Sequence, residues 1–474
     1  MKRHLFINGQ WKEAAHYEAL YSPFSGEWIA DVGYANEAET DEAIQAAQAA
    51  AQVMAQMPAH ERTAILNKVA ELLEKRKEEL SRLVALEAAK PLKTARGELA
   101  RTIQTYKFAA MEASRIHGET VPLDAAPGGE GRIAFTLRKP LGVIAAITPF
   151  NFPFNLVAHK VGPAIAAGNT IVLKPSGQTP LSALVLAEIF QEAGLPKGAL
   201  NVIPGPGAVV GEKLVSDPRV KAVTFTGSPA VGIAMKNKAG LKRVTLELGS
   251  NSALLIDKAY EITDELISRC VLGAFSYSGQ VCISIQRIFV HELHHDNFMN
   301  RFKAQVEKLV IGDPLEESTD VSALISEKEV RRMQNWVDSA VSKGAVVITG
   351  GKELNSRMYP PTILTHVAAD EPVSCEEVFG PIVTVSSFTS LDQAIKDVNQ
   401  SRYGLQAGIY TNDIRAAMRA AEQLEVGGVM INDFPTFRVD NMPYGGVKES
   451  GFGREGVRYA VEELTELKFI SIKL

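Results

Sequence analysis

Three side chains far apart in the sequence supply the parts for acyl chemistry at an aldehyde carbon. Asn151 lies in the stretch TPFNFP, Glu247 in LELG and Cys282 in SGQVCIS. A thiol can attack the carbonyl carbon, an amide can hold the oxyanion that results, and a carboxylate can activate water. Taken singly, each residue also has a plainer interpretation: an inert buried thiol, a surface carboxylate and a turn-forming asparagine.

The bulk composition excludes several classes of protein. With 474 residues, 46% of them hydrophobic and 22% charged, the chain is expected to form two or three globular domains. A net charge of -5 argues against nucleic-acid binding. No secretory signal or membrane-spanning run is visible. The three cysteines form no CxxC pair, which fits a reducing cytoplasm better than a disulfide framework or a metal site, and we interpret Cys270 and Cys375 as structural.

The first 138 residues predict small strands, then helices, then a hairpin. Residues 5–34 contain short strand-like pieces. Residues 37–116 are rich in Ala, Leu, Glu and Lys with helical periodicity, and Pro58 and Pro91 divide them into separate helices. In 118–138, two strand-like runs flank a Gly/Pro turn.

From residue 141 onward, strands and helices alternate, which indicates a parallel, doubly wound sheet with ligands at the carboxyl ends of its strands. The predicted strands are 141–147, 170–174, 200–203, 220–226 and 243–248, with helices at 155–167, 180–193, 207–216 and 229–239. A second α/β unit follows, with helices at 261–276, 294–308, 326–342, 392–400 and 413–424 and strands at 286–290, 345–348, 382–388 and 408–410. The C-terminal β-rich tail is expected to pair with the chain's own hairpin or with another subunit.

Glycine-rich turns in the first α/β unit suggest a dinucleotide site. Gly207 and Gly211 follow a strand in the spacing G-x-G-x-x-x-G, which is also typical of an ordinary tight turn. In FTGSP, Ser228 is placed as a helix N-cap, so free amides there could face a pyrophosphate. Lys174 and Ser176, which end another strand, could bind an adenosine ribose, although a solvated lysine remains an alternative.

Seven segments together resemble the aldehyde dehydrogenase superfamily and occur in the order of that family. They are 148–153 (TPFNFP), 174–176 (KPS), 225–228 (FTGS), 246–249 (LELG), 279–282 (GQVC), 377–381 (EVFGP) and 443–451 (PYGGVKESG). The resemblance implies an α/β fold with a Rossmann-type dinucleotide-binding domain (1–117 and 139–248), a catalytic α/β domain (249–430) and a β-hairpin oligomerisation element (118–138 and 453–474). It also implies a homodimer or a homotetramer.

The resemblance assigns roles to individual residues. Cys282 is the nucleophile, Asn151 and the Cys282 N–H hold the oxyanion, hydride leaves the thiohemiacetal for NAD or NADP, and Glu247 activates the water that cleaves the thioester. Lys160 either supports this site or simply packs nearby. The implied cofactor contacts are Thr148, Pro149, Phe150, Lys174, Ser176, Gly177, Gly207, Gly211, Phe225, Thr226, Gly227, Ser228, Leu248, Glu377 and Phe379. The implied substrate contacts are Arg101, Phe152, His159, Val281 and Arg438.

One departure from the family pattern concerns the nucleotide. Many relatives that prefer NAD carry a glutamate directly after KPS, where it grips the ribose hydroxyls, and this chain has Gly177. A missing carboxylate removes repulsion against a 2′-phosphate. We therefore expect dual use of the two nucleotides or a preference for NADP.

A second departure concerns the substrate. The segments 431–433 and 438–443 resemble a subgroup that contains non-phosphorylating glyceraldehyde-3-phosphate dehydrogenases, lactaldehyde dehydrogenases and enzymes for phosphono- or sulfo-aldehydes. Arg101 and Arg438 match two phosphate-binding residues of the phosphate-specific members, but Val281 and Phe152 replace their arginine and tyrosine. We expect a small 2-hydroxyaldehyde such as lactaldehyde, or a short sulfonated, phosphonated or phosphorylated aldehyde. Two alternatives stay open: Arg438 as a partner in a surface ion pair, and Arg101 as an ordinary residue of its helix with no role in the site.

Two other functions remain as alternatives. A coenzyme-A-acylating semialdehyde dehydrogenase would share the fold, but such relatives often lack the glutamate found here at position 247. A catalytically retired binding protein is disfavoured because all three chemical residues are retained. No membrane or nucleic-acid partner is expected.

Overall fold

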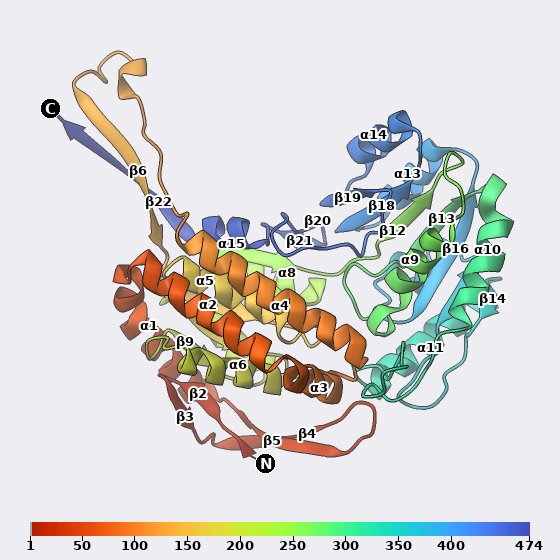
Figure 1. Ribbon diagram of the computed structural model, residues 1–474, viewed down its shortest axis with the longest axis horizontal. Helices are drawn as coiled ribbons and strands as arrows, with labels where there is room; N and C mark the ends of the chain where they lie inside the picture. Colours follow the sequence, from red (N-terminus) through yellow and green to blue (C-terminus); the bar gives the residue numbers. More distant parts are fainter. Residues whose placement is uncertain (1) are drawn as a thin grey trace.

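The computed structural model describes residues 2–474 and builds them around two large sheets, with a slender two-stranded arm that projects from one side (Figure 1). The helices between residues 37 and 113 lie over the first sheet, and the chain then enters the arm, returns to complete that sheet and continues into the second (Figure 1). No helix in residues 2–474 is long and apolar enough to cross a membrane.

The first sheet has eight strands in the order β21-β11-β10-β7-β8-β9-β2-β3. Its parallel centre consists of β7 (Val143–Ile147), β8 (Thr170–Lys174), β9 (Leu200–Val202), β10 (Val220–Thr226) and β11 (Arg243–Glu247). Antiparallel strands β2 (Leu5–Ile7), β3 (Gln10–Lys12) and β21 (Gly451–Phe452) complete its edges. The doubly wound parallel sheet predicted from the alternating pattern is confirmed.

Helices cover both faces of this sheet, which is why its central strands are almost wholly apolar. They are α1 (Glu37–Gln56), α2 (Ala59–Lys75), α3 (Lys77–Ala88), α4 (Leu92–Ala113), α5 (Asn155–Ala166), α6 (Pro180–Glu192), α7 (Glu212–Ser216, after the π-helical turn η2, Gly207–Gly211) and α8 (Pro229–Lys238). Pro58 and Pro91 precede α2 and α4, as predicted. A further break at Arg76 was not predicted, because no proline or glycine marks it.

The second sheet has seven strands in the order β14-β15-β16-β13-β12-β18-β19. They are β12 (Ala253–Ile256), β13 (Arg287–His291), β14 (Val346–Thr349), β15 (Thr362–Thr365), β16 (Ile382–Phe388), β18 (Gln406–Tyr410) and β19 (Gly428–Ile431). The helices of this unit are α9 (Asp264–Phe275), α10 (Glu292–Val306), α11 (Glu327–Ser342), α12 (Pro372–Cys375), α13 (Leu391–Asn399) and α14 (Ile414–Gln423), with the 3₁₀ turn η3 (Ser276–Gly279). The sequence did not predict β12, β15 and β19, which have only four residues each.

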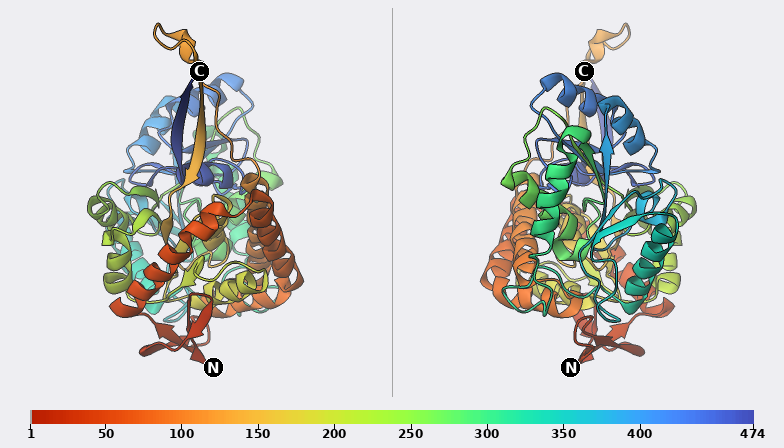
Figure 2. Two further views of the ribbon diagram at one scale, coloured as in Figure 1. Left: turned by 90° about the vertical axis from the view of Figure 1, so that its left-hand side faces the viewer. Right: turned by 90° about the vertical axis from the view of Figure 1, so that its right-hand side faces the viewer.

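The projecting arm pairs two segments from opposite parts of the chain. Strand β6 (Arg132–Pro140) runs antiparallel to the C-terminal strand β22 (Thr465–Lys473) over its whole length (Figures 1 and 2). The hairpin predicted within 118–138 forms as one isolated bridge between Thr120 and Phe135, with backbone hydrogen bonds from Val121 to Ala134 and from Thr136 to Glu119, both at 2.9 Å. The C-terminal tail thus pairs within its own chain, which is one of the two predicted outcomes. Exposed apolar residues on the arm include Ile133, Leu137, Leu467, Phe469 and Ile472.

The remaining elements are small. Strands β1 (Lys2–Arg3), β4 (His16–Tyr21) and β5 (Trp28–Tyr34) form a sheet of their own, and β17 (Tyr403–Gly404) pairs with β20 (Val447–Lys448). The 3₁₀ turn η1 (Leu123–Ala125) lies in the arm, and α15 (Val457–Glu463) leads into β22. Helix α15 was not predicted as a separate element.

Candidate active site

Cys282 lies in the loop between η3 and β13, and the backbone of η3 directly before this loop is unusual. Tyr277, Ser278 and Gly279 all adopt left-handed conformations, with φ of 49°, 53° and 70°. Such angles cost a non-glycine residue about 1–2 kcal/mol. At Gly279 a Cβ would lie 2.1 Å from the carbonyl oxygen of Gly380, so only glycine fits there.

Hydrogen bonds from distant segments hold the loop in this shape. The Tyr277 hydroxyl donates to the Ala88 carbonyl at 3.0 Å, and the Ser278 hydroxyl donates to the Ser322 carbonyl at 2.9 Å. The Tyr277 ring also packs edge-to-face on Phe152. These contacts to buried groups offset the backbone strain and fix the direction in which Cys282 leaves the loop.

Asn151 contacts the same loop from the turn that precedes α5. Its side-chain Nδ2 donates to the carbonyl of Gln280 at 3.0 Å, and its residue is 2% exposed. A carboxamide nitrogen carries two protons, so one remains for a second acceptor. The Cys282 backbone N–H makes no hydrogen bond within residues 2–474. Two donors therefore remain beside the sulfur.

The Cys282 thiol has one polar neighbour that the sequence did not predict. Its Sγ lies 3.2 Å from the hydroxyl of Tyr444. Burial raises the pKa of the Cys282 thiol to about 11, and the Tyr444 hydroxyl and the Arg438 charge act in the opposite direction. The thiol is therefore protonated in the unliganded protein and must be ionised when it reacts.

Glu247 ends β11 and is 3% exposed. Neither of its carboxyl oxygens has a hydrogen-bond partner among the described residues. Burial, and then the nearby charge of Glu455, raises the pKa of this carboxyl well above its usual range. A Cβ at Gly445 would lie 3.0 Å from Oε1 of Glu247, so the glycine leaves room for the carboxyl group.

Glu455 organises the charges behind the thiol. Its Oε1 accepts from Nζ of Lys160 at 2.7 Å, and its Oε2 accepts from Arg438 at 3.3 Å. Burial acts to raise the pKa of Glu455, but Lys160, His159 and Arg438 together hold it below its usual range. Lys160 also donates to the Thr224 hydroxyl at 3.1 Å. No sequence motif pointed to Glu455, which lies 295 residues from Lys160.

A cleft of about 610 Å³ opens beside Cys282 at the carboxyl ends of the first sheet's strands. Every predicted cofactor contact lines it, together with Asn151, Cys282, Ser326, Glu329 and Arg332. Those predicted contacts are Thr148, Pro149, Phe150, Lys174, Ser176, Gly177, Gly207, Gly211, Phe225, Thr226, Gly227, Ser228, Leu248, Glu377 and Phe379.

The cleft has the polar groups that a nicotinamide dinucleotide requires. The Thr226 hydroxyl is buried and has no partner in the described chain. Burial lowers the pKa of Lys174 to about 8, and within residues 2–474 its Nζ contacts only the Pro175 carbonyl, at 3.3 Å. Burial raises the pKa of Glu377 to about 7, although the Ser250 N–H donates to it at 2.9 Å. A buried hydroxyl without a partner is costly, so Thr226 fits a site that a ligand completes.

A second cavity, of about 690 Å³, opens on the other side of the catalytic loop. Three of the five predicted substrate contacts line it: Arg101, Phe152 and Val281. Its wall also includes Lys93, Thr94, Gly97 and Glu98 of α4, Ser268, Val271, Leu272 and Phe275 of α9, and Ser276, Ile283, Gln305, Leu309, Asp320 and Thr436.

The other two predicted substrate contacts, His159 and Arg438, border neither cavity in the described chain, and neither does Lys160. His159 and Arg101 both bind Asp440, at 2.8 and 2.7 Å. The Arg438 side chain is only 5% exposed and lies 3.5 Å above the Tyr444 ring. These residues support the walls of the site from behind.

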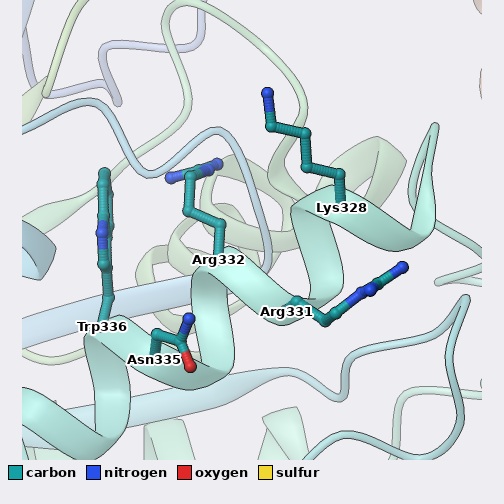
Figure 3. A pocket seen from close by; sticks show the side chains of 5 residues that line it. All are labelled: Lys328, Arg331, Arg332, Asn335 and Trp336. Carbon is teal, nitrogen blue, oxygen red and sulfur yellow. The ribbon is translucent and has the colours of Figure 1, made fainter.

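Arg332 of α11 is a cleft residue that the sequence did not predict. It donates to Glu329 at 2.7 Å and to the Val378 carbonyl at 2.6 Å. Its other side borders a hollow of about 410 Å³, where Lys328, Arg331 and Arg332 project from α11 beside Trp336 (Figure 3). Amphipathic periodicity predicted α11 but could not show which of its cations face the cleft.

Comparison with known proteins identifies the family. The aldehyde dehydrogenase family model matches residues 11–470. The chain is 46% identical to a 3-sulfolactaldehyde dehydrogenase of Priestia aryabhattai, over 99% of this chain and 98% of that protein. It is 40% identical to a lactaldehyde dehydrogenase of Methanococcus aeolicus, over 99% of both. An NADP-dependent glyceraldehyde-3-phosphate dehydrogenase from Bacillus halodurans, solved with NADP, superposes with a TM-score of 0.97 at 37% identity and covers 100% of both chains. The chain belongs to the aldehyde dehydrogenase family, an NAD(P)-dependent family of aldehyde-oxidising enzymes.

Proposed function

We propose that Cys282 attacks the aldehyde carbon and that this chain releases the product as a free carboxylic acid. The observation that carries the proposal is the position of the thiol between two cavities. Cys282 lines the cofactor cleft, and its neighbours Val281 and Ile283 line the second cavity. An aldehyde can therefore reach the sulfur from one side and a hydride acceptor from the other, which is the geometry that the oxidation requires.

In this proposal Asn151 and the Cys282 N–H hold the oxyanion that forms when sulfur attacks the carbonyl. Asn151 Nδ2 donates one of its two protons to the Gln280 carbonyl, and the second proton remains available for the oxyanion, which supports the assignment. A bound nicotinamide nucleotide supplies the hydride acceptor. The turn that carries Asn151 and the loop that carries Cys282 are joined by this one hydrogen bond, so both donors stay aligned during the reaction.

Glu247 is the proposed general base for cleavage of the thioester. A carboxylate with a raised pKa is a stronger base toward water than an exposed one. Its two oxygens without partners leave it free to accept that proton. Retention of this residue supports hydrolysis rather than acyl transfer to coenzyme A.

The proposed substrates are small 2-hydroxyaldehydes and short anionic aldehydes, with a sulfonated aldehyde favoured among the latter. Support comes from the relative at 46% identity, which acts on 3-sulfolactaldehyde. It also comes from Arg101 at the cavity wall. Asp440 takes two of the five N–H donors of this guanidinium, through Nε and one terminal nitrogen, so others remain for an anionic group.

Apolar residues limit how strongly the cavity can hold a doubly charged group. Val281 and Phe152 add no donor, and Asp440 offsets part of the Arg101 charge. Lys93 is likewise paired, with Asp320. We therefore propose that a singly charged sulfonate suits the cavity better than a phosphate dianion.

For the nucleotide, we propose dual use with a preference for NADP. Gly177 lines the cleft beside Lys174 and Ser176. A Cβ at position 177 would lie 2.2 Å from the Tyr34 hydroxyl, which donates to the Gly177 carbonyl at 3.3 Å. A glutamate side chain thus has no room there while Tyr34 keeps its place, and no carboxylate opposes a 2′-phosphate.

We also propose that the chain forms a homodimer or homotetramer, as the family resemblance implies. The proposed domains have the boundaries predicted above, and the proposed location is the cytoplasm. Exposed Leu467 and Phe469 on the arm support the assembly, because apolar residues of this size are normally covered. Deletion of residues 465–474 should shift the mass measured by light scattering to that of the monomer. An unchanged mass would contradict a role for the arm in assembly.

The decisive experiment measures the formation of reduced nicotinamide from lactaldehyde, 3-sulfolactaldehyde and glyceraldehyde-3-phosphate with each nucleotide. Cys282→Ala should abolish turnover, whereas the matched control Cys375→Ala, which changes a thiol on α12, should retain it. Release of free acid without coenzyme A would support the role of Glu247. Turnover that survives in Cys282→Ala would refute the proposed nucleophile.

A further inference from the structure

The hydroxyl of Tyr444 has a single polar contact in the described chain, and that contact is the sulfur of the proposed nucleophile. Oη and Sγ lie 3.2 Å apart. Tyr444 is 3% exposed, so water does not reach it freely. A buried phenol that points at a thiol, with no other partner, is more than a hydrophobic wall of the substrate site.

Three separate contacts fix this phenol in place. The backbones of Tyr444 and Glu455 exchange two hydrogen bonds, of 3.0 and 2.6 Å. The Glu455 side chain accepts from Arg438 at 3.3 Å. The Arg438 guanidinium in turn lies over the Tyr444 ring, 3.5 Å from the ring centroid. The ring is thus held between its own backbone anchor and a stacked cation, which restricts where its hydroxyl can point.

The charges around the pair decide which atom donates. Burial, and then the neighbouring Cys282, raises the pKa of Tyr444 well above its usual range, so the phenol keeps its proton when the thiol ionises. An O–H group that faces a thiolate donates to it, and hydrogen bonds to charged groups are about twice as strong as neutral ones. The bond therefore favours the ionised form of Cys282 over the neutral form.

We propose that Tyr444 is a catalytic hydrogen-bond donor that stabilises the thiolate of Cys282 and aims its sulfur. This inference rests on the proposed function of Cys282 as nucleophile. The donated bond is strongest while the sulfur carries its negative charge. It weakens once the carbon–sulfur bond forms, because the charge then passes to the carbonyl oxygen beside Asn151.

Tyr444→Phe tests the proposal because it removes the hydroxyl and keeps the ring on Arg438. The thiolate of Cys282 is titrated by its ultraviolet absorbance and by its rate of alkylation with iodoacetamide, without substrate or nucleotide. The titration midpoint should rise by about one pH unit. Alkylation at neutral pH should slow by about threefold, since about tenfold fewer thiolates each react about threefold faster.

A second variant moves the midpoint in the opposite direction. Site-specific 3-fluorotyrosine at position 444 keeps the shape of the side chain and makes the phenol a stronger donor, so the midpoint should fall. It also serves as the test if the phenylalanine variant fails to fold. Tyr359→Phe is the matched control, because it removes a buried hydroxyl without a partner in the cluster under α11 and should leave the midpoint unchanged.

Two results would overturn the inference: the same midpoint in wild type and Tyr444→Phe, or no response to fluorination. Either result leaves the nucleophile itself untouched, since loss of turnover in Cys282→Ala is measured separately. Conversely, turnover that survives in Cys282→Ala would refute the nucleophile whatever the titration gives.

Discussion

Replacement of Asn151 by alanine should separate catalysis from stability. Among the residues that the structure describes, the side chain makes one hydrogen bond, from Nδ2 to the Gln280 carbonyl at 3.0 Å. Loss of that bond and of a partner for the buried carbonyl should lower the free energy of unfolding by about 1–3 kcal/mol. The second Nδ2 proton acts only when the oxyanion forms, so its loss should lower kcat by about 10²–10³-fold, or about 2.7–4 kcal/mol.

The two effects are measured by different assays. Steady-state turnover at saturating aldehyde and nucleotide gives kcat per active molecule, and denaturant titration gives the free energy of unfolding. Asn169→Ala is the matched control. This buried asparagine donates to the Leu464 carbonyl and accepts from the Gly142 N–H, both at 2.9 Å. The control, which loses two hydrogen bonds, should lose at least as much stability as Asn151→Ala and keep its kcat.

The reasoning fails if kcat of Asn151→Ala stays within about fivefold of wild type while stability falls as expected. Asn151 would then only anchor the catalytic loop through Gln280, and the Cys282 N–H or another donor would hold the oxyanion. An equal fall of kcat in both variants would assign the loss to general loosening of the fold.

Three further predictions follow from contacts in the site. Glu247→Gln should keep a first burst of reduced nicotinamide, but its steady turnover should fall by about 10²–10⁴-fold. In the wild type, the rate of deacylation should increase as the pH rises through the raised pKa of Glu247. Stopped-flow traces of the variant should lack this pH dependence. Arg101→Ala should raise KM for anionic aldehydes by about tenfold and leave KM for lactaldehyde nearly unchanged. Arg438→Ala should lower kcat for both kinds of substrate, because it leaves the buried charge of Glu455 short of a partner. Initial rates in which Arg438→Ala raises KM for the anionic aldehydes alone would place Arg438 in the pocket. Gly177→Glu alone should weaken the binding of both nucleotides, since Tyr34 fills the space. Only the double variant with Tyr34→Ala should show, by fluorescence titration, a nucleotide preference shifted toward NAD. A shifted preference in the single variant would refute the steric argument.

The parallel core of the first sheet could be predicted because its signals are local. Strands β8 and β10 are apolar runs bounded by turn residues, and their predicted ends match the structure. Strands β12, β15 and β19, of four residues each, were not predicted, although β14, which has the same length, was.

The arm shows the limit of local signals more sharply. The Gly/Pro turn in 118–138 predicted a hairpin, but the ladder that β6 forms with β22 is nine residues long and joins segments more than 300 residues apart. The run before the turn pairs with β6 at a single bridge, between Thr120 and Phe135, whereas the distant strand pairs with β6 over its whole length. Only a pairing pattern between the two segments could have revealed this.

The site follows the same rule. The motifs around Cys282, Glu247 and Asn151 were readable because each is continuous in the sequence. The partners of the arginines were not, since Arg438 pairs with Glu455, 17 residues further along, and Arg101 of α4 pairs with Asp440, 339 residues further along. Burial separates the two: the Arg438 side chain is 5% exposed and paired with Glu455, whereas the Arg101 side chain is 30% exposed at the cavity wall.

These pairings change how the specificity of the site should be understood. Two arginines near a reactive cysteine suggest a strongly positive pocket, yet Asp440 binds Arg101 and Glu455 binds Arg438. Hydrogen bonds from His159 and Arg101 outweigh burial and keep the pKa of Asp440 well below its usual range, so its charge persists at any physiological pH. The field at the cavity wall is therefore modest, and the remaining N–H donors of Arg101 provide direction more than strength. A site of this kind can accept a sulfonate and still turn over a neutral hydroxyaldehyde, because neither substrate must overcome a large uncompensated charge.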